Sequence, residues 1–254
     1  MLQQRVLPLP PLEYRGLVSP VTDDSYYDNP SGDYIWGPLN IAPLTAGEAY
    51  RKILDFGCGC GREVRRLMLQ NAPPEEIVGV DISRKMIDWC SANLGCPGVS
   101  FQHHDVWNIW YAPDNHRNRV MPLTPAGSDF SLIEANSVFT HLLEDQSTFY
   151  LEEMSGMLAP KGLIRATWFF INKKAFPMMM EAQNTVFIDE TDLTKAVFYD
   201  WEFFVRTTRR LGYKIVNVEW ADMLGFHNTV YLGRDECFTE LDIAAPPSTS
   251  CLGF

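Results

Sequence analysis

Three glycines that directly follow an apolar run constrain this chain more than any other feature. Residues 53–62 read Ile-Leu-Asp-Phe-Gly-Cys-Gly-Cys-Gly-Arg, and Val64, Leu67 and Met68 then fall at helical spacing. Glycine permits a tight backbone turn and lets main-chain groups approach a ligand closely. The stretch therefore predicts a strand, a ligand-binding turn and a helix over residues 63–70.

The same alternation of strand and helix continues along the chain. Strands are predicted at 53–55, 77–80, 99–102, 130–135 and 163–170, and helices at 83–93, where Ser83 is a suitable N-cap, and at 145–158. A helix at 200–211 then precedes two alternating stretches, 214–220 and 226–232, that are typical of paired antiparallel strands. We expect an α/β, doubly wound, Rossmann-like fold with a seven-stranded, mostly parallel sheet and an antiparallel C-terminal strand pair.

The composition fits one globular domain with an extension at each end. Hydrophobic residues make up 46% of the 254 residues and charged residues 21%, which is typical of a folded chain. Residues 1–47 are rich in Pro, Tyr, Asp and Gly, and they predict an N-terminal arm or lid. Residues 48–242 would form the domain, and residues 243–254 a flexible tail.

Charge and hydropathy argue against several classes of partner. The chain carries 21 Lys and Arg residues against 32 Asp and Glu, and the resulting charge of −11 repels phosphate backbones, so we expect no nucleic-acid partner. No apolar stretch approaches the roughly 18 residues that cross a bilayer. The six cysteines are scattered instead of framing loops, which favours reduced thiols. We therefore expect a cytoplasmic protein without a membrane span.

The charge beside the glycine turn discriminates between nucleotide ligands. In a dinucleotide-binding turn the third glycine stands one position later, where this chain has Arg62. Asp55, just before the glycines, would repel a pyrophosphate, whereas it suits the amino group and the positive sulfonium of S-adenosylmethionine. The pattern thus disfavours NAD and favours a cationic ligand.

Two further acids end the next two predicted strands. Asp81 lies near the spacing at which a carboxylate accepts both ribose hydroxyls. Asp105 offers an acceptor for an exocyclic adenine amine, and the backbone N–H of Val106 offers a donor for a ring nitrogen. Met86, one helical turn beyond Asp81, could pack on the adenine face. These positions predict an adenosine site at one edge of the sheet.

In this order the residues resemble class I S-adenosylmethionine-dependent methyltransferases, over about residues 52–170. The resemblance implies that the turn holds the methionine part of the cofactor, that Asp81 binds its ribose, and that Asp105 and Val106 bind its adenine. The expected cofactor-binding residues are Asp55, Gly57, Cys58, Gly59, Gly61, Asp81, Ile82, Met86, Asp105, Val106, Asn136 and Ser137. Residues 137–142 and 157–162 look like a subgroup associated with glycan and secondary-metabolite modification. Ser131 stands where an acid is common in the family, and Pro-Lys-Gly at 160–162 replaces the usual Pro-Gly-Gly.

His141, which follows the predicted fourth strand, is the candidate general base. The carboxyl end of that strand faces the cofactor crevice in such folds, and an imidazole removes protons near neutral pH. His141 could equally cap or pack against the helix at 145–158. No metal site is expected, because His103 and His104 would point to opposite faces of an extended segment. The small-residue requirement of the turn explains Cys58 and Cys60 without a metal.

The resemblance predicts a methyltransferase that acts on a small-molecule acceptor, with a hydroxyl of a sugar or natural product favoured. Three alternatives stay open: N-methylation of a small metabolite, a noncatalytic S-adenosylmethionine-binding subunit, and a nicotinamide oxidoreductase. Methionines at 178–180 and aromatic residues at 201–204 could cover the crevice or equally form a homodimer face.

Overall fold

The computed structural model describes residues 6–28, 33–123, 126–221, 226–243 and 246 of the chain. Its tertiary contacts divide the chain into two compact units, Met1–Leu132 and Ile133–Phe254. The boundary falls inside one strand, β4 (Phe130–Ala135). The predicted tail at 243–254 lies largely outside the described residues.

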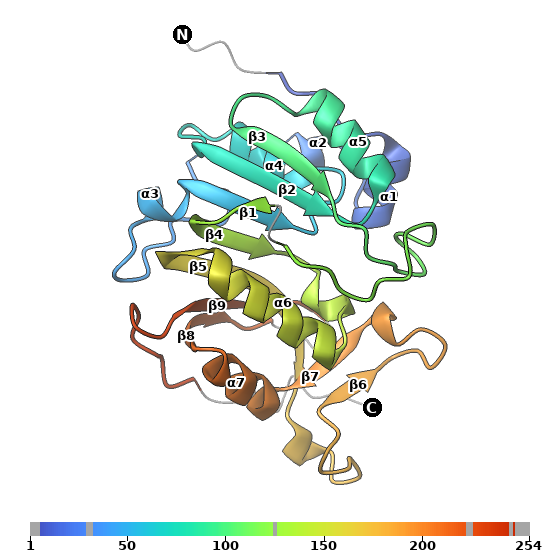
Figure 1. The fold of residues 1–254 in the computed structure, drawn as a ribbon, viewed down its shortest axis with the longest axis vertical. Coiled ribbons are helices and arrows are strands. Elements are labelled where there is room, and N and C mark those ends of the chain that lie inside the picture. The colour runs from blue at the N-terminus through green and yellow to red at the C-terminus, as the bar shows by residue number, and fades with distance from the viewer. Residues whose placement is uncertain (1–5, 29–32, 124–125, 222–225, 244–245, 247–254) are drawn as a thin grey trace. The chain divides into compact units, whose positions relative to one another are not determined.

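Parallel strands organise the first unit. β1 (Lys52–Phe56), β2 (Glu76–Asp81) and β3 (Val99–His103) lie in the order β3-β2-β1, with Asp55 in register with Gly79 and Asp81 with His103. α4 (Arg62–Met68) and α5 (Arg84–Asn93) connect the strands, and α5 packs on β2 and β3 (Figure 1). Because parallel pairing brings the carboxyl ends of the strands to one edge, this edge carries the glycine turn, Asp81 and Asp105.

The N-terminal segment contributes to the core of the first unit. It contains three short helices, α1 (Leu12–Val18), α2 (Asp24–Tyr27) and α3 (Ala46–Ala49). Tyr27 and Ala49 are fully buried, and Leu39 and Tyr50 are nearly so. No hydrophobic periodicity predicted this burial, because the segment is rich in proline and its partners lie far along the chain.

A buried arginine anchors the N-terminal segment on α4. The Arg65 guanidinium, on a side chain that is 2% exposed, donates to the carbonyl oxygens of Pro8 (3.2 Å), Leu7 (3.0 Å) and Tyr27 (2.7 Å), and it pairs with Asp28. Arg15 on α1 acts similarly within the segment, and its guanidinium donates to the carbonyl oxygens of Pro10 (2.7 Å) and Thr22 (2.8 Å). A guanidinium suits such sites because it carries five N–H donors and no acceptor.

The second unit combines parallel and antiparallel strands. Its elements are η2 (Phe139–His141), α6 (Glu144–Met157), β5 (Leu158–Ile171), η3 (Lys173–Ala175), β6 (Thr185–Phe187), η4 (Leu193–Lys195), β7 (Val197–Asp200), α7 (Trp201–Arg210), β8 (Tyr213–Glu219) and β9 (Asn228–Arg234). β5 pairs in parallel with β7, whereas the β5–β9, β8–β9 and β6–β7 pairs are antiparallel.

Helices α6 and α7 lie over one face of the strands of the second unit (Figure 1). Ser147 of α6 shares a hydrogen bond of 2.6 Å with the Tyr199 hydroxyl, and Phe204 of α7 packs on Trp168 of β5. Phe139 and Phe170 also stack on Trp168, so aromatic side chains dominate this core.

The predicted fold class is confirmed: the protein is mixed α/β, with a mostly parallel central sheet and an antiparallel strand pair, β8 and β9. β6 and β7 are two strands beyond the seven predicted. They span only three and four residues, which is too short for a period-two pattern to stand out.

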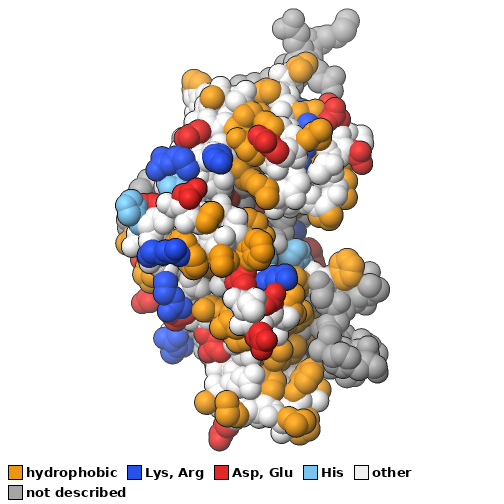
Figure 2. Space-filling view, turned by 90° about the vertical axis from the view of Figure 1, so that its right-hand side faces the viewer, with side chains coloured by type: hydrophobic (Ala, Val, Ile, Leu, Met, Phe, Trp, Pro, Cys, Tyr) orange, Lys and Arg blue, Asp and Glu red, His pale blue; other side chains and the backbone are white. Residues whose placement is uncertain are grey.

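The surface of the described residues shows no membrane-spanning element. None of their helices combines the length and the apolar character that a span requires. On the face drawn in Figure 2, Lys and Arg side chains are interspersed with Asp and Glu, and hydrophobic side chains lie between them.

Candidate functional site

The glycine turn between β1 and α4 has the left-handed backbone that its sequence predicts. The φ angles of Gly57, Gly59 and Gly61 are 84°, 52° and 77°. Residues other than glycine rarely adopt such φ angles. Space is also limited at Gly61, where a Cβ atom would lie 2.7 Å from Leu94 Cδ1. Gly61 therefore allows the end of α5 to pack closely on the turn.

Three amides of the turn are already committed inside the protein. Gly57 N and Cys58 N both donate to Val80 O, at 2.7 and 3.0 Å. Gly59 N donates to Asp81 Oδ2 at 2.8 Å. A pyrophosphate needs such amides as free donors. The turn is therefore poorly suited to a dinucleotide, and its carbonyl oxygens suit a ligand that carries an amino group.

Asp55 places a buried carboxylate beside this turn. It is the penultimate residue of β1 and is 2% exposed. Burial of a carboxylate is costly unless positive charge or donors compensate it. The negative charge of Asp55 beside the turn would favour a cationic ligand there. Burial, aided by the charges of Asp81 and Asp55, also raises the pKa of the Cys58 thiol well above its ordinary value. Cys58 is thus a neutral packing residue at pH 7.

Asp81 ends β2, and its carboxylate already accepts two backbone hydrogen bonds. Oδ2 accepts from Gly59 N, and Oδ1 accepts from Ser83 N at 2.7 Å. Burial raises the pKa of Asp81, and these two backbone hydrogen bonds oppose the shift. Each carboxylate oxygen can accept more than one hydrogen bond, so both retain capacity for the two ribose hydroxyls. Ser83, the predicted N-cap of α5, makes no side-chain cap bond.

The N-terminal segment covers the turn at Gly59. A Cβ atom at Gly59 would lie 2.7 Å from Val18 Cγ1 and 4.0 Å from Met86 Sδ. Met86 belongs to a buried cluster with Tyr27 and Cys60, against which Leu9, Tyr14 and Val18 pack. Met86 therefore lies beside the turn, as predicted from its spacing, but it is packed against the N-terminal segment. The adenine-stacking role of Met86 stays a prediction.

The loop after β3 is tied to the ends of two strands. Asn115 Nδ2 donates to Ile82 O and to Val106 O, both at 2.9 Å. Asp105 accepts from His116 N at 3.2 Å and pairs with the His116 imidazole, whose hydrogen bond lowers the pKa of Asp105. Sequence reasoning missed Asn115 and His116, because they lie in an irregular loop that carries no periodic signal.

The Val106 amide, predicted to face an adenine ring nitrogen, donates to His104 O at 2.7 Å. A ring nitrogen would have to share or displace this bond. His104 itself is buried, and burial lowers its pKa to about 4. In the described residues, no group of three or more His, Cys, Asp or Glu side chains is arranged to hold a metal ion. The cysteines among them, Cys58, Cys60, Cys90, Cys96 and Cys237, are free thiols.

The remaining predicted residues belong to the second unit. Asn136 and Ser137 follow β4, and Ser137 has a φ of 59°, which is unusual outside glycine. Its amide donates to Thr167 Oγ1 at 2.7 Å. His141 ends η2, with its Nδ1 2.9 Å from Thr194 O. The roles of these three residues at a cofactor or acceptor stay predictions.

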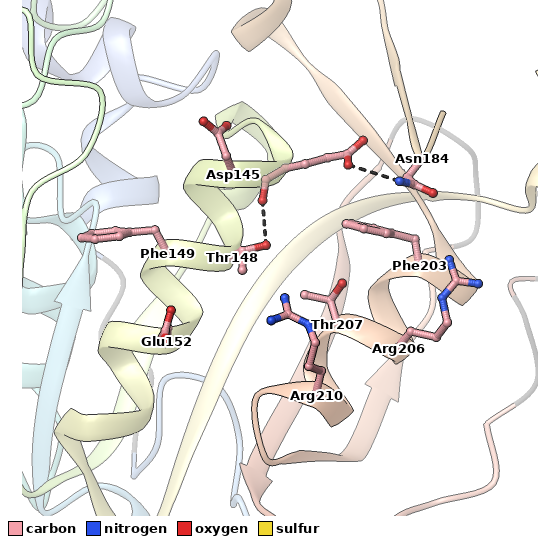
Figure 3. A pocket seen from close by; sticks show the side chains of 10 residues that line it. Asp145, Thr148, Phe149, Glu152, Asn184, Phe203, Arg206, Thr207 and Arg210 are labelled. Atoms are coloured by element: carbon pink, nitrogen blue, oxygen red, sulfur yellow. Dashed lines mark hydrogen bonds between the residues drawn. The ribbon is translucent and has the colours of Figure 1, made fainter. Parts of the chain in front are cut away.

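A pocket of about 880 Å³ lies between α6 and α7 of the second unit (Figure 3). Acidic side chains from α6 and basic side chains from α7 line it, together with the aromatic rings of Phe149 and Phe203. Glu144 on its rim accepts from Asn184 Nδ2 at 3.2 Å. None of the predicted site residues lines this pocket.

A family model and a curated relative each match part of this chain. Residues 53–162 match a family model described as a methyltransferase domain. An uncharacterized methyltransferase from Emericella nidulans is 40% identical over 57 residues, which is 22% of this chain and 20% of that protein. The matched part thus spans about a fifth of this relative's length.

Two solved structures align with this chain. An O-methyltransferase family protein from Burkholderia thailandensis aligns with a TM-score of 0.52 at 12% identity, over 76% of this chain and 54% of its own. A TehB-like SAM-dependent methyltransferase from Corynebacterium glutamicum aligns over 74% of this chain and 87% of its own, with a TM-score of 0.45 and 17% identity. Residues 53–162 are therefore similar to a methyltransferase domain, and the chain shares its fold with the Burkholderia thailandensis protein.

Proposed function

We propose that this chain is an enzyme that transfers the methyl group of S-adenosylmethionine to a hydroxyl of a small polar acceptor, a sugar or natural product. The observation that carries the choice of donor is the buried Asp55 beside a turn whose first three amides are committed elsewhere. That arrangement favours a cationic ligand and disfavours a pyrophosphate. The motifs at 137–142 and 157–162 support the choice of acceptor.

The residues of the first unit divide the cofactor among them. Asp55 and the turn from Gly57 to Gly61 would hold the amino acid part, since they offer a carboxylate and carbonyl acceptors. Asp81 would accept the ribose hydroxyls, and Asp105 the adenine amine. Ile82, Met86 and Val106 would surround the adenosine.

The N-terminal segment, residues 1–47, would close over the methionine side of this site as a lid. Support comes from Val18, which packs on Gly59, and from Tyr27, which packs on Cys60 and Met86. A lid that excludes water would hold donor and acceptor together, because methyl transfer depends chiefly on alignment, worth roughly 7 to 11 kcal/mol.

S-adenosylmethionine, when bound, supplies an electrophilic methyl group on a positive sulfur. The chain must then align the acceptor and take its proton. His141 would act as general base, a contribution of about 10² to 10⁴ in rate. Its Nδ1 lies 2.9 Å from Thr194 O, a contact in which an imidazole carries its hydrogen on Nδ1.

A product screen tests the proposal. The protein is incubated with S-adenosylmethionine and with methyl glucoside, catechol or tyramine, and the products are analysed by mass spectrometry. A gain of one methylene mass on oxygen supports the proposal. A methylated amine would instead support N-methylation. Cofactor binding without product from any hydroxylated compound would favour a noncatalytic subunit. Gly59→Val, which adds a branched side chain where Val18 leaves no room, should abolish the product.

A further inference from the structure

Helices α6 and α7 of the second unit turn the same pattern of residues towards the pocket that lies between them (Figure 3). From Asp145 to Glu152 on α6, and from Phe203 to Arg210 on α7, the lining residues stand at positions i, i+3, i+4 and i+7. Residues at this spacing share one face of a helix. Two helical faces therefore form opposite walls of the pocket.

The two walls carry opposite charges that do not neutralise each other. Glu152 on α6 and Arg206 and Arg210 on α7 are all exposed. Within the described residues, the ion pairs of α7 run to η3 and to Glu240, and none runs to α6. Arg206 interacts electrostatically with Glu202 on its own helix. The carboxylate of Glu152 and the guanidinium of Arg210 thus remain available to a ligand.

Aromatic rings and a hydroxyl lie between the charged groups. Phe149 and Phe203 are half-buried, and Phe149 packs edge-on against Tyr150 with ring centroids 5.3 Å apart. Thr148 Oγ1 donates to Glu144 O at 2.8 Å, so the lone pairs of this hydroxyl can accept a hydrogen bond from a ligand. The lining therefore suits a ligand that has an apolar side chain and an N–H group.

The balance of charge narrows the class of ligand further. Three acidic side chains and two basic ones line the pocket, so a ligand with negative charge alone would be repelled by the lining as a whole. Figure 3 shows the Arg210 side chain extending from α7 towards α6, where its guanidinium can bind a carboxylate. A ligand with one positive and one negative group satisfies both walls.

We infer that this pocket binds a short peptide with free ends, whose ammonium group contacts Glu152 and whose carboxylate contacts Arg210. Three extended residues span about 10 Å, which matches the roughly 8–10 Å between the axes of neighbouring helices. A single amino acid carries its two charges too close together to reach both walls. The volume of about 880 Å³ falls within the range of about 300–1,000 Å³ that is typical of ligand sites.

Nuclear magnetic resonance titration of the full chain with four forms of one tripeptide tests the inference. The forms of glycyl-phenylalanyl-glycine are the free peptide, the N-acetylated peptide, the C-amidated peptide and the doubly capped peptide. We expect the free peptide to bind best and to shift the amides of Thr148 and Thr207. Loss of either charge should lower the affinity about two- to fivefold at low salt, because exposed ion pairs are weak.

The other outcomes of this titration each overturn the proposal. Equal affinities for the four forms would make the pocket an apolar groove that does not distinguish charge. Tighter binding of a form with one charge would make it a site for a simple anion or cation. Absence of shifts at Thr148 and Thr207 with the free peptide would mean that the pocket binds no such ligand.

Two variants assign the charges to the walls. Glu152→Gln should remove the difference in affinity between the free and the N-acetylated peptide, and Arg210→Gln the difference between the free and the C-amidated peptide. Both side chains are exposed, so both variants should keep the wild-type Tm. Arg209→Gln, on the same helix but paired with Glu240 outside the pocket lining, is the matched control and should keep all four affinities.

A difference in affinity that survives its variant would overturn the assignment of that charge and with it the proposal. The titrations need neither S-adenosylmethionine nor an acceptor, and none of the predicted cofactor residues lines the pocket. Their failure would therefore leave the proposed methyl transfer untouched, and failure of methyl transfer would leave the peptide site standing.

Discussion

Replacement of Arg65 by Met tests how strongly the N-terminal segment is bound to α4. The guanidinium donates to three carbonyl oxygens, two of them in buried contacts, and pairs with Asp28. Met has a similar length but no donor, so it would leave these acceptors without their hydrogen bonds. Loss of one partner from a buried ionic site costs about 3–5 kcal/mol. A change of 1 kcal/mol shifts Tm by about 2–4 °C in a chain of this size, so we expect Tm to fall by roughly 6–20 °C.

The assay is calorimetric melting of the wild type, Arg65→Met and Arg66→Met, combined with limited proteolysis. Arg66, the matched control, lies on the same helix, but its side chain is 25% exposed and pairs with Glu63. Because Glu63 also pairs with Arg62, replacement of Arg66 should cost less than replacement of Arg65. Proteolysis should cut Arg65→Met first within the N-terminal segment. Equal melting temperatures for the two variants would refute the anchoring role of Arg65.

Three further predictions concern the first unit. Asp81→Asn should weaken S-adenosylhomocysteine binding by about 1.5–3 kcal/mol, because hydrogen bonds to a charged acceptor are lost. Titration calorimetry measures this change, and an unchanged Kd would exclude Asp81 from the ribose site. Gly61→Ala should destabilise the fold, since its Cβ would lie 2.7 Å from Leu94 Cδ1 at a φ of 77°, and a wild-type urea midpoint would contradict this. Stability should decline as pH falls from about 6.5 towards 4, because the pKa of His104 is lowered to about 4 in the fold and the unfolded chain binds the proton first. In His104→Gln, urea titrations should show a free energy of unfolding that changes less between about pH 6.5 and 4. An unchanged pH dependence in this variant would mean that other groups cause the decline.

The sequence predicted elements best where residue type and local geometry are tightly linked. The glycine turn was predicted because only glycine fits its three left-handed positions, and it fixed β1 and α4 on either side. α7 was predicted from its periodicity, and Asp200 caps its N-terminus by accepting from Phe203 N at 3.1 Å. In such cases a few neighbouring residues determine the structure.

What the sequence did not reveal depends on contacts between distant residues. Arg65 looked like an ordinary surface residue of a helix, and only the folded chain shows its carbonyl partners, 38 to 58 positions away. His227 stood in a stretch read only for its alternation, and its stacking partner Phe169 comes from a different strand. Asn115 and His116 likewise lie in a loop whose contacts no local pattern encodes.

Titration calorimetry of the purified protein with S-adenosylmethionine, S-adenosylhomocysteine and NAD tests the central claim most directly. The buried Asp55 and the committed amides of Gly57, Cys58 and Gly59 predict binding of both adenosyl compounds and none of NAD. Binding of NAD without binding of S-adenosylmethionine would contradict this account of the glycine turn.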